Sequence, residues 1–473
     1  MVFVRMVRIT VLASMTMALS AAAQSPRVVV VGAGIAGLTT AYRLQQKGID
    51  VQVYEARGRV GGRILSAMIG GMPIELGGHN LTDGGAAENV YQLISELGLD
   101  LVTRSMPLNE SYFDGKNLVS LRHLLNAKKF DPLTLQIQLT DLAMNALNMR
   151  EVLDGVLPKD DILNGILATR LAAYEGAPVE QLSPWYTETL YHMLLGGLAA
   201  TRPADDNMTQ HVTVSGGNSL LLQKMAQALG DRVHLNSALT AVVTNSDKSM
   251  TLTFNSSTQV VADIVVLAIP CSLFGGITFD AATLPADRVQ AISQVSYTTN
   301  AKVLIPFSPS LISSSGDVVG ESMVSVVDAQ HGLVTTYLTG MQGLFTPETI
   351  HDVYTTIRPL ISTALVDVCP PVAEPVYAQD KQGVSYTGPV GYSWVNDPWV
   401  RGSYSYVAAG QEMVFAMVTE VAGEPVKALF TPVHNKVYFA GEHASVLMDV
   451  TGTIEAACES GERTARMIVK AVL

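Results

Sequence analysis

The stretch Arg27-Val28-Val29-Val30-Val31-Gly32-Ala33-Gly34-Ile35-Ala36-Gly37 decides the fold. Its four valines predict a fully buried parallel strand, because a strand covered on both faces reads as a continuous β-branched run. The pattern G-x-G-x-x-G follows at once. Helix-forming residues then run from Leu38 to Gln46, until Lys47-Gly48 ends the predicted helix. A strand, a glycine-rich turn and a helix in this order predict an α/β fold of the Rossmann type.

The glycines of this turn predict a dinucleotide site. Gly32 permits the sharp turn, Gly34 lets the backbone approach a pyrophosphate, and Gly37 lets the helix pack close to the strand. Ala36 lies in the same turn and is a further candidate contact. The N-terminus of the helix would face the phosphate charge.

A second predicted strand, residues 50–54, ends at Glu55. Its carboxylate can accept both ribose hydroxyl protons of an adenosine, and its distance from the glycines along the chain fits that role. Such a unit binds NAD, NADP or FAD, and the motif alone does not choose between these cofactors.

The residues that follow indicate the cofactor. Residues 55–63 read Glu-Ala-Arg-Gly-Arg-Val-Gly-Gly-Arg and resemble the segment after the second strand in flavin amine oxidases and their relatives. The resemblance implies FAD, with Arg63 against its pyrophosphate and Arg57 and Gly62 close by. A guanidinium offers a planar fork to phosphate oxygens, and the two glycines let the chain fold back over the dinucleotide.

Later segments extend the resemblance over roughly residues 26–470; they are residues 75–78, 214–218, 262–270, 437–443 and 452–463. It implies that Glu442 reaches the ribityl chain and that a helix starting at Ile454 points its amides at the O2 and N1 edge of the flavin. The helix dipole would stabilise negative charge there. Further implied cofactor contacts are Gly77, Gly78, Leu239, Trp399, Gly441, Gly452 and Thr453.

The resemblance also implies a discontinuous FAD-binding domain, with an α+β substrate-binding domain inserted twice. The FAD domain would comprise residues 24–85, 206–275 and 395–473, and the substrate domain residues 86–205 and 276–394. Apolar residues at three- and four-residue steps from Leu133 to Met149 predict one amphipathic helix of a helical lid. The β-branched runs 302–305 and 333–338 predict strands that floor the substrate cavity.

Three residues are the catalytic candidates. Lys302 matches the lysine that holds a water molecule beside flavin N5 in these oxidases, and Tyr404 matches one member of their aromatic cage. Thr453 stands where the second cage aromatic would fall, which predicts a roomier and more polar substrate site. Ser403 replaces the cysteine that links FAD covalently in monoamine oxidases, so we expect non-covalent FAD.

These matches predict oxidation of a small amine by hydride transfer to flavin N5, with hydrolysis of the imine to a carbonyl product. Oxygen, giving hydrogen peroxide, or a periplasmic acceptor would reoxidise the flavin. Asn80 stands where amino-acid oxidases carry a carboxylate-binding arginine, although Arg170 or Arg202 could substitute. Roles for His79 and His443 stay open. The alternatives are a desaturase or porphyrinogen-oxidase-like enzyme, and a non-catalytic flavin-binding protein.

Composition and the N-terminal sequence limit where the protein acts and which partners it can have. Residues 1–23 have the charged, apolar and small-residue order of a signal peptide, which predicts an exported protein without a stable membrane span. Without that segment the chain has 28 basic and 42 acidic side chains, a charge of −14, so a nucleic-acid partner is not expected. No metal-ligand spacing is present, and a homodimer is compatible with the sequence.

Overall fold

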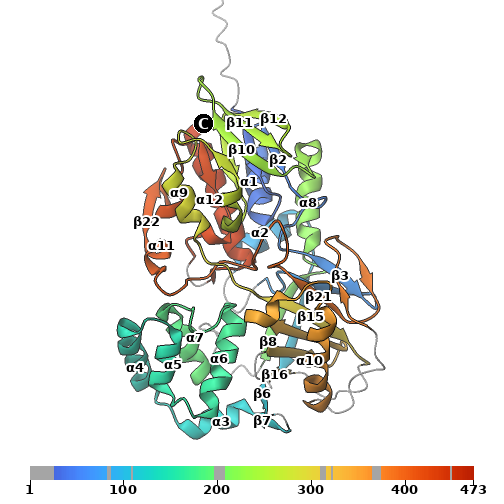
Figure 1. The fold of residues 1–473 in the computed structure, drawn as a ribbon. Coiled ribbons are helices and arrows are strands. Elements are labelled where there is room, and N and C mark those ends of the chain that lie inside the picture. Colours follow the sequence, from blue (N-terminus) through green and yellow to red (C-terminus); the bar gives the residue numbers. More distant parts are fainter. Residues whose placement is uncertain are drawn as a thin grey trace, which may run out of the picture.

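The computed structural model describes residues 26–81, 87–107, 110–114, 116–196, 208–308, 316–320, 323–364, 374–447 and 450–473. The predicted signal peptide, residues 1–23, lies outside the described residues, as do the predicted domain boundaries at 85/86 and 205/206. Figure 1 shows two lobes, an upper one that contains both α1 and α12 and a lower one with helices on one side and a sheet on the other. None of the helices in the described ranges is long and apolar enough to cross a membrane.

The upper lobe is built on a parallel sheet whose strands come from distant parts of the chain. The predicted strand of four valines lies at its centre and pairs on both sides with parallel strands. This confirms the α/β fold of the Rossmann type. In spatial order the strands are β24 (Val437–Phe439), β13 (Ile264–Leu267), β1 (Val28–Val31), β2 (Val51–Tyr54) and β9 (Val233–His234).

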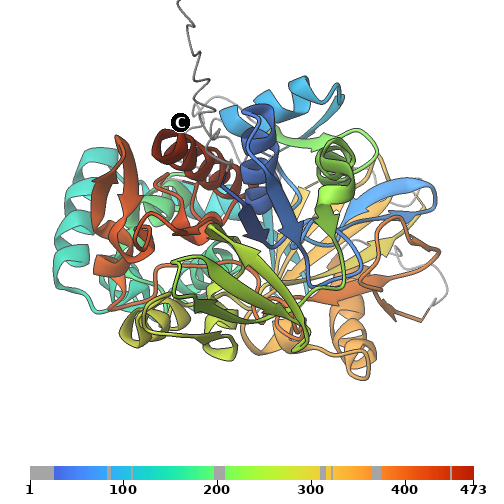
Figure 2. The same cartoon turned by 90° about the horizontal axis from the view of Figure 1, so that it is seen from above.

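Helices cover this sheet, and two of them approach very closely. A Cβ on Gly461 of α12 would lie 2.5 Å from the carbonyl oxygen of Ala36 in α1, so glycine is required there. Figure 2 shows the two helices side by side although they come from opposite ends of the chain. The helices of this lobe are α1 (Ile35–Gln46), α2 (Glu88–Glu96), α8 (Ser219–Leu229), α9 (Ala286–Ser293), α11 (Glu412–Ala416) and α12 (Ile454–Val472).

Smaller sheets complete the upper lobe and its border. One is β12 (Thr258–Ala262), β11 (Met250–Phe254), β10 (Leu239–Thr244) and β14 (Thr278–Phe279). Another is β20 (Ser385–Tyr386), β3 (Ser66–Ile69) and β4 (Met72–Glu75). Two-stranded pairs are β22 (Val418–Val421) with β23 (Glu424–Lys427), and β5 (Leu101–Pro107) with β8 (Met208–Val214).

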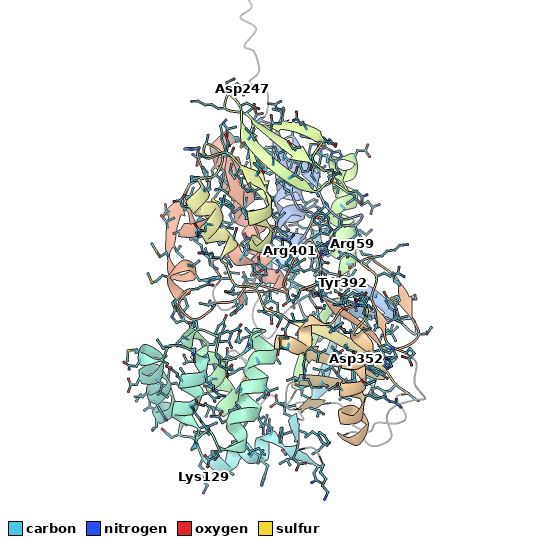
Figure 3. All side chains as sticks on the ribbon, viewed as in Figure 1. Arg59, Lys129, Asp247, Asp352, Tyr392 and Arg401 are labelled. Atoms are coloured by element: carbon cyan, nitrogen blue, oxygen red, sulfur yellow. The ribbon has the colours of Figure 1, made fainter. Side chains whose placement is uncertain are left out.

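The lower lobe contains an eight-stranded sheet with α10 (Ile350–Ala364) beside it. Both runs predicted as strands lie at its centre and pair with each other. Arg59, Tyr392 and Arg401 lie where this lobe meets the upper one (Figure 3). In spatial order the strands are β19 (Val376–Tyr377), β21 (Val390–Ser393), β15 (Ala301–Pro306), β18 (Leu333–Leu338), β17 (Met323–Asp328), β16 (Gly316–Val319), β6 (Glu110–Phe113) and β7 (Leu118–Ser120).

The other side of the lower lobe is helical, as predicted. The predicted helix from Leu133 to Met149 is confirmed as α4 but ends at Asn145, and the Asn148 side chain, which accepts a hydrogen bond from the Glu151 amide, starts the next helix at Met149. The helices are α3 (Leu121–Lys128), α4 (Pro132–Asn145), α5 (Met149–Val156), α6 (Ile162–Glu175) and α7 (Thr187–Leu194).

Candidate active site

One cavity of about 1180 Å³ is lined by residues of both lobes. Every site residue predicted from the sequence lines its wall except Gly37, which lies behind it. The wall therefore includes the glycine turn at the end of β1, the start of α12, Lys302 of β15 and Tyr404. The described part of the chain contains no cluster of side chains that could hold a metal ion.

The glycines of the turn have different tasks. A Cβ on Gly32 would lie 2.4 Å from the Ala268 carbonyl oxygen, and one on Gly37 would lie 2.0 Å from the Gly32 carbonyl oxygen. Both positions therefore require glycine because the protein's own backbone packs too closely for a side chain. A Cβ on Gly34 would meet no atom within 4 Å, so this residue borders open space at the N-terminus of α1. Such a cradle fits the pyrophosphate of a dinucleotide.

Glu55 ties the end of β2 to this turn. Its Oε2 accepts a hydrogen bond of 2.7 Å from the Ala33 amide, and its Oε1 accepts one of 2.9 Å from the Arg57 amide. Burial raises the pKa of Glu55, while these two amides and nearby arginines act to lower it. Glu55 lines the cavity wall, and its contact with a ribose stays a prediction.

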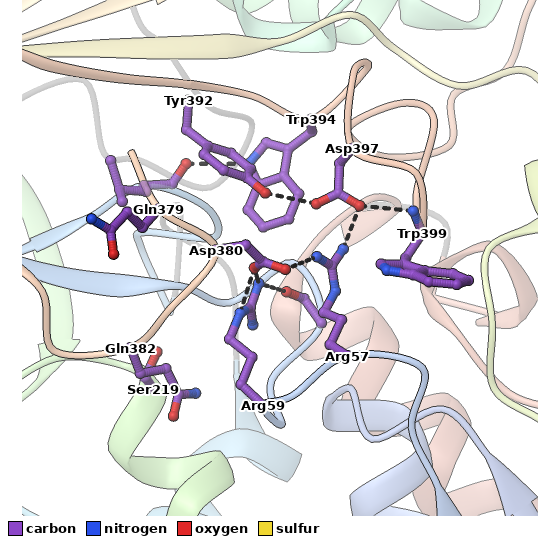
Figure 4. A network of polar contacts seen from close by, with 12 residues as sticks. Arg57, Arg59, Ser219, Gln379, Asp380, Gln382, Tyr392, Trp394, Asp397 and Trp399 are labelled. Atoms are coloured by element: carbon purple, nitrogen blue, oxygen red, sulfur yellow. Dashed lines mark hydrogen bonds and ion pairs between the residues drawn. The ribbon is translucent and has the colours of Figure 1, made fainter. Parts of the chain in front are cut away.

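The Arg57 side chain is held by protein groups (Figure 4). Its guanidinium forms ion pairs with Asp380 and, at 2.6 Å, with Asp397. Asp397 also accepts hydrogen bonds from the Tyr392 hydroxyl at 2.7 Å and from the Trp399 amide at 2.9 Å. The structure thus gives Arg57 a task that the motif did not predict, which is to anchor residues 55–63 to the segments around Asp380 and Asp397.

Arg63 and Glu442 meet on the cavity wall. Arg63 Nη1 donates to Glu442 Oε1 and to the Ser403 carbonyl oxygen, each at 2.8 Å. Ser405 donates to the same carboxylate through its hydroxyl at 2.5 Å and its amide at 3.1 Å. Burial alone would raise the pKa of Glu442, but the Arg63 charge and these hydrogen bonds bring the pKa below its ordinary value. Glu442 is therefore an anion fixed in place beside the cavity.

Lys302 is a buried lysine on the same wall, with a relative exposure of 8%. It is the second residue of β15, between β18 and β21. Its Nζ donates to the carbonyl oxygen of Gly77 at 2.6 Å and lies 5.2 Å from the centre of the Tyr337 ring. Lys302 therefore joins the lower sheet to the loop that carries Gly77 and Gly78.

Tyr404 and Thr453 lie near each other, but their hydroxyls are engaged. The Tyr404 hydroxyl donates to the Tyr174 carbonyl oxygen at 3.1 Å and accepts from Asn300 Nδ2 at 2.5 Å. The Thr453 hydroxyl donates to the Val450 carbonyl oxygen at 2.6 Å and caps α12 by accepting from the Ala456 amide at 3.2 Å. The Thr453 hydroxyl therefore serves the start of α12, and its single hydrogen is already used.

Asn300 and Glu175 are among the polar residues of the wall that sequence reasoning missed. Asn300 precedes Lys302 by two residues, and the alternation of side chains along a strand could have suggested it. Glu175 ends α6 and accepts a hydrogen bond of 2.7 Å from the Thr189 hydroxyl. Burial raises the pKa of Glu175 to about 7. No local pattern indicated that this acid faces the cavity.

The structure also gives the positions of most of the remaining candidate residues. His79 lines the cavity, and His443 is buried, with Nδ1 3.3 Å from the Tyr297 hydroxyl. Burial lowers the pKa of His443 to about 4, so its ring is neutral at neutral pH. Arg170 forms a buried ion pair with Glu110, and Arg202 lies outside the described residues. Leu239, Trp399 and Ile454 contribute apolar surface to the wall.

Comparisons with known proteins agree with this geometry. Residues 35–469 match the model of the flavin containing amine oxidoreductases. AofH of Mycobacterium tuberculosis, which is named as a flavin-containing monoamine oxidase, is 28% identical over 281 residues, and the match covers 54% of this chain and 59% of AofH. Polyamine oxidase 4 of Oryza sativa subsp. japonica is 25% identical over 489 residues, which cover 95% of this chain and 90% of that protein.

The fold is also found among solved structures. Putrescine oxidase bound to putrescine superimposes with a TM-score of 0.70 at 20% sequence identity, and the likeness covers 94% of this chain and 99% of that chain. At this identity the likeness concerns the fold. It places the arrangement of the two lobes in a known architecture.

Proposed function

Since the chain belongs to the family of flavin-containing amine oxidoreductases, we propose that it oxidises the C–N bond of a small amine to an imine, which water hydrolyses to a carbonyl product. The observation that carries this proposal is that one and the same cavity wall includes the glycine turn, Lys302 and Tyr404. It leaves room for a dinucleotide and an organic substrate in contact with each other.

FAD is the cofactor, and it is held without a covalent bond. When bound, it supplies the two-electron acceptor for the hydride that leaves the substrate α-carbon. The open space at Gly34 and the presence of Glu55 and Glu442 on the cavity wall support the proposal that these residues hold the pyrophosphate, the ribose and the ribityl chain. Ser403 has no thiol with which to form a thioether to the flavin.

The chain's own residues supply orientation and a dry cavity. We assign to Lys302 the task of orienting a water molecule at the cavity wall, and to the Tyr404 ring the task of a flat, apolar face for the substrate. An amine without a carboxylate is the proposed substrate, because Glu110 already neutralises Arg170 and Asn80 Oδ1 accepts from the Val212 amide. Neither residue is poised as a dedicated carboxylate clamp.

The setting of the reaction is part of the proposal. We propose export under the control of residues 1–23, and reoxidation by oxygen, with release of hydrogen peroxide, or by a periplasmic electron acceptor. Measurement of hydrogen peroxide in aerated turnover, with and without an artificial acceptor, separates these two routes.

Anaerobic mixing tests the function and the substrate class together. Purified protein is mixed with monoamines, polyamines and amino acids while flavin absorbance is recorded. We expect at least one amine without a carboxylate to bleach the flavin. Failure of every amine to do so would contradict the proposal and favour a desaturase-like or porphyrinogen-oxidase-like enzyme, or a non-catalytic flavoprotein.

A further inference from the structure

Glu175 is an acid on the cavity wall, and one of its oxygens is not used by the described residues. Its Oε1 accepts a hydrogen bond of 2.7 Å from the Thr189 hydroxyl, and Thr189 also lines the cavity. Its Oε2 has neither a hydrogen bond nor an ion pair in the described part of the chain. The side chain is enclosed by protein but keeps accessible surface. Unlike Asn300 Oδ1, Oε2 is not sealed off from solvent, so it is open to the cavity.

Glu175 lies next to the ring that we assign to the substrate. The carbonyl oxygen of the preceding residue, Tyr174, accepts the hydrogen bond of the Tyr404 hydroxyl at 3.1 Å. A Cβ on the following residue, Gly176, would lie 2.7 Å from the same hydroxyl. Burial raises the pKa of the Tyr186 and Tyr404 hydroxyls, and the Glu175 charge is the next largest cause for both. The carboxylate therefore lies close to two aromatic side chains of the substrate end.

The acids at the cofactor end of the wall already have partners. Both oxygens of Glu55 and both oxygens of Glu455 accept hydrogen bonds from backbone amides. Glu442 pairs with Arg63 and accepts two hydrogen bonds from Ser405. These carboxylates are held by the protein, whereas Glu175 Oε2 is available to a ligand.

The proposed oxidation requires that the amine lose a proton before its hydride leaves. A simple alkylammonium has a pKa near that of lysine, about 10.4, so most of an amine reaches the protein as the cation. The cation has no lone pair on nitrogen with which to expel a hydride from the α-carbon. A proton acceptor on the wall would let the protein use this abundant form directly.

We propose that Glu175 Oε2 receives the proton that the substrate ammonium loses in the cavity. The inference rests on the proposed function and names the residue that prepares the amine for oxidation. One N–H bond breaks and one O–H bond forms at Oε2, while the electron pair stays on nitrogen. That lone pair then drives the hydride, with its two electrons, from the α-carbon to the flavin and leaves the protonated imine. The proton on Glu175 passes to water when the product leaves.

The surroundings of Glu175 suit a proton acceptor. Burial raises its pKa from 4.5 to about 7, although the Thr189 hydrogen bond acts to lower it. The carboxyl group is therefore ionised above about pH 7 and holds a proton better than an ordinary glutamate does. Its titratable neighbours are Tyr186 and Tyr404, whose hydroxyls keep their protons at neutral pH because their pKa values are raised.

The pH dependence of flavin reduction tests this assignment. In the wild type the reactive pair forms from ionised Glu175 and the ammonium, so the second-order rate constant of anaerobic reduction should be level between about pH 7 and the amine pKa of about 10. Glu175→Gln can use only the neutral amine, and its rate constant should rise about tenfold per pH unit over this range. Glu188→Gln, which removes an exposed acid of the same wall, is the control and should keep the level profile.

Calorimetry tests the same step without turnover. The ligand is 2-phenylpropan-2-amine, whose α-carbon carries no hydrogen, so it cannot lose a hydride there. Binding to the holoenzyme at about pH 8.5, in two buffers with different enthalpies of ionisation, gives the number of protons exchanged with the solution. We expect no net exchange for the wild type, because the ammonium binds to ionised Glu175. Glu175→Gln should bind the neutral amine and release about one proton.

Several results would overturn the role of Glu175. His79 and Asp317 also line the cavity, and if either received the proton, Glu175→Gln would keep the level profile and release no proton. Release of about one proton by the wild type contradicts the inference as well. The same holds if Glu175→Gln binds no amine even at about pH 10, where the neutral form is abundant. If this variant does not fold, the wild-type profile and proton count still decide.

The two measurements separate this inference from the proposed function. If amines bleach the flavin but the profiles of wild type and Glu175→Gln are the same, the proposed function stands without a role for Glu175. If the proton counts differ as expected but no amine bleaches the flavin, Glu175 holds the substrate proton and the proposed oxidation fails.

Discussion

The cofactor end and the substrate end of the cavity satisfy their polar groups in different ways. At the cofactor end, Glu55, Arg57 and Glu442 all find partners within the chain. At the substrate end, Asn300 Oδ1 and Arg170 Nη1 are buried without a partner in the described part of the chain. The two carboxylates and the Arg57 guanidinium of the first end are thus held in place by folding alone, whereas these two atoms of the second end find no such partner.

Two glycine variants test how far folding alone builds the cofactor end. Gly37→Ala places a methyl group 2.0 Å from a backbone oxygen and should lower the free energy of unfolding by about 4 kcal/mol. Gly34→Ala meets no protein atom within 4 Å and should fold normally but bind FAD poorly. Thermal unfolding and flavin content measure the two effects. Equal stability of both variants would contradict the division of tasks between the glycines.

The second prediction concerns the ion pairs of Arg57, which a substitution of Asp397 disrupts. Asp397→Asn removes a charge whose side chain is only 1% exposed, and we expect a loss of about 3 kcal/mol in the free energy of unfolding. Asp263→Asn breaks an exposed pair with Arg27 and should cost less than about 1 kcal/mol. Denaturant unfolding of both variants measures the two losses in free energy. Similar losses would mean that the network does not anchor residues 55–63.

At the substrate end, the acid Glu175 predicts a dependence of stability on pH. Its pKa is raised by burial from 4.5 to about 7 in the folded protein, so its stabilising effect is fully present below pH 4.5 and is lost as the pH rises through about 7. Glu175→Gln should therefore gain stability over the wild type across this window, by about 2 kcal/mol. Denaturant midpoints at several pH values measure the gain. A constant difference between the two proteins would show that Glu175 has an ordinary pKa.

Substitution of Lys302 should give the smallest change in free energy among these variants. Lys302→Met should leave flavin content intact and slow flavin reduction or reoxidation about tenfold, which corresponds to about 1.4 kcal/mol. Stopped-flow absorbance measures both half-reactions. Lys436→Met, which removes a partly exposed lysine that does not line the cavity, is the control. Unchanged kinetics in Lys302→Met would remove the assignment of this lysine.

The difference between the cofactor end and the substrate end also explains which parts of the structure could be predicted from the sequence. The strand of valines and the glycine turn are local patterns with one structural solution, so β1, α1 and the cofactor wall could be placed in advance. The anchoring of Arg57 by Asp380 and Asp397 depends on contacts over more than three hundred residues of sequence, as does the pairing of Arg63 with Glu442. No local pattern encodes such contacts.

The substrate end was harder to predict for a second reason. Asn300 and Glu175 have no motif of their own, and their importance depends on which face of the cavity they border. The early end of the predicted helix, at Asn145 rather than Met149, has a local cause: the side chain of Asn148 caps the next helix, which apolar periodicity alone does not reveal.

The absorbance spectrum of the purified protein, before and after incubation with FAD, tests the central claim most directly. We predict that the folded protein binds one flavin per chain and releases it on denaturation. A protein that unfolds cooperatively, is colourless and takes up no added FAD would contradict it.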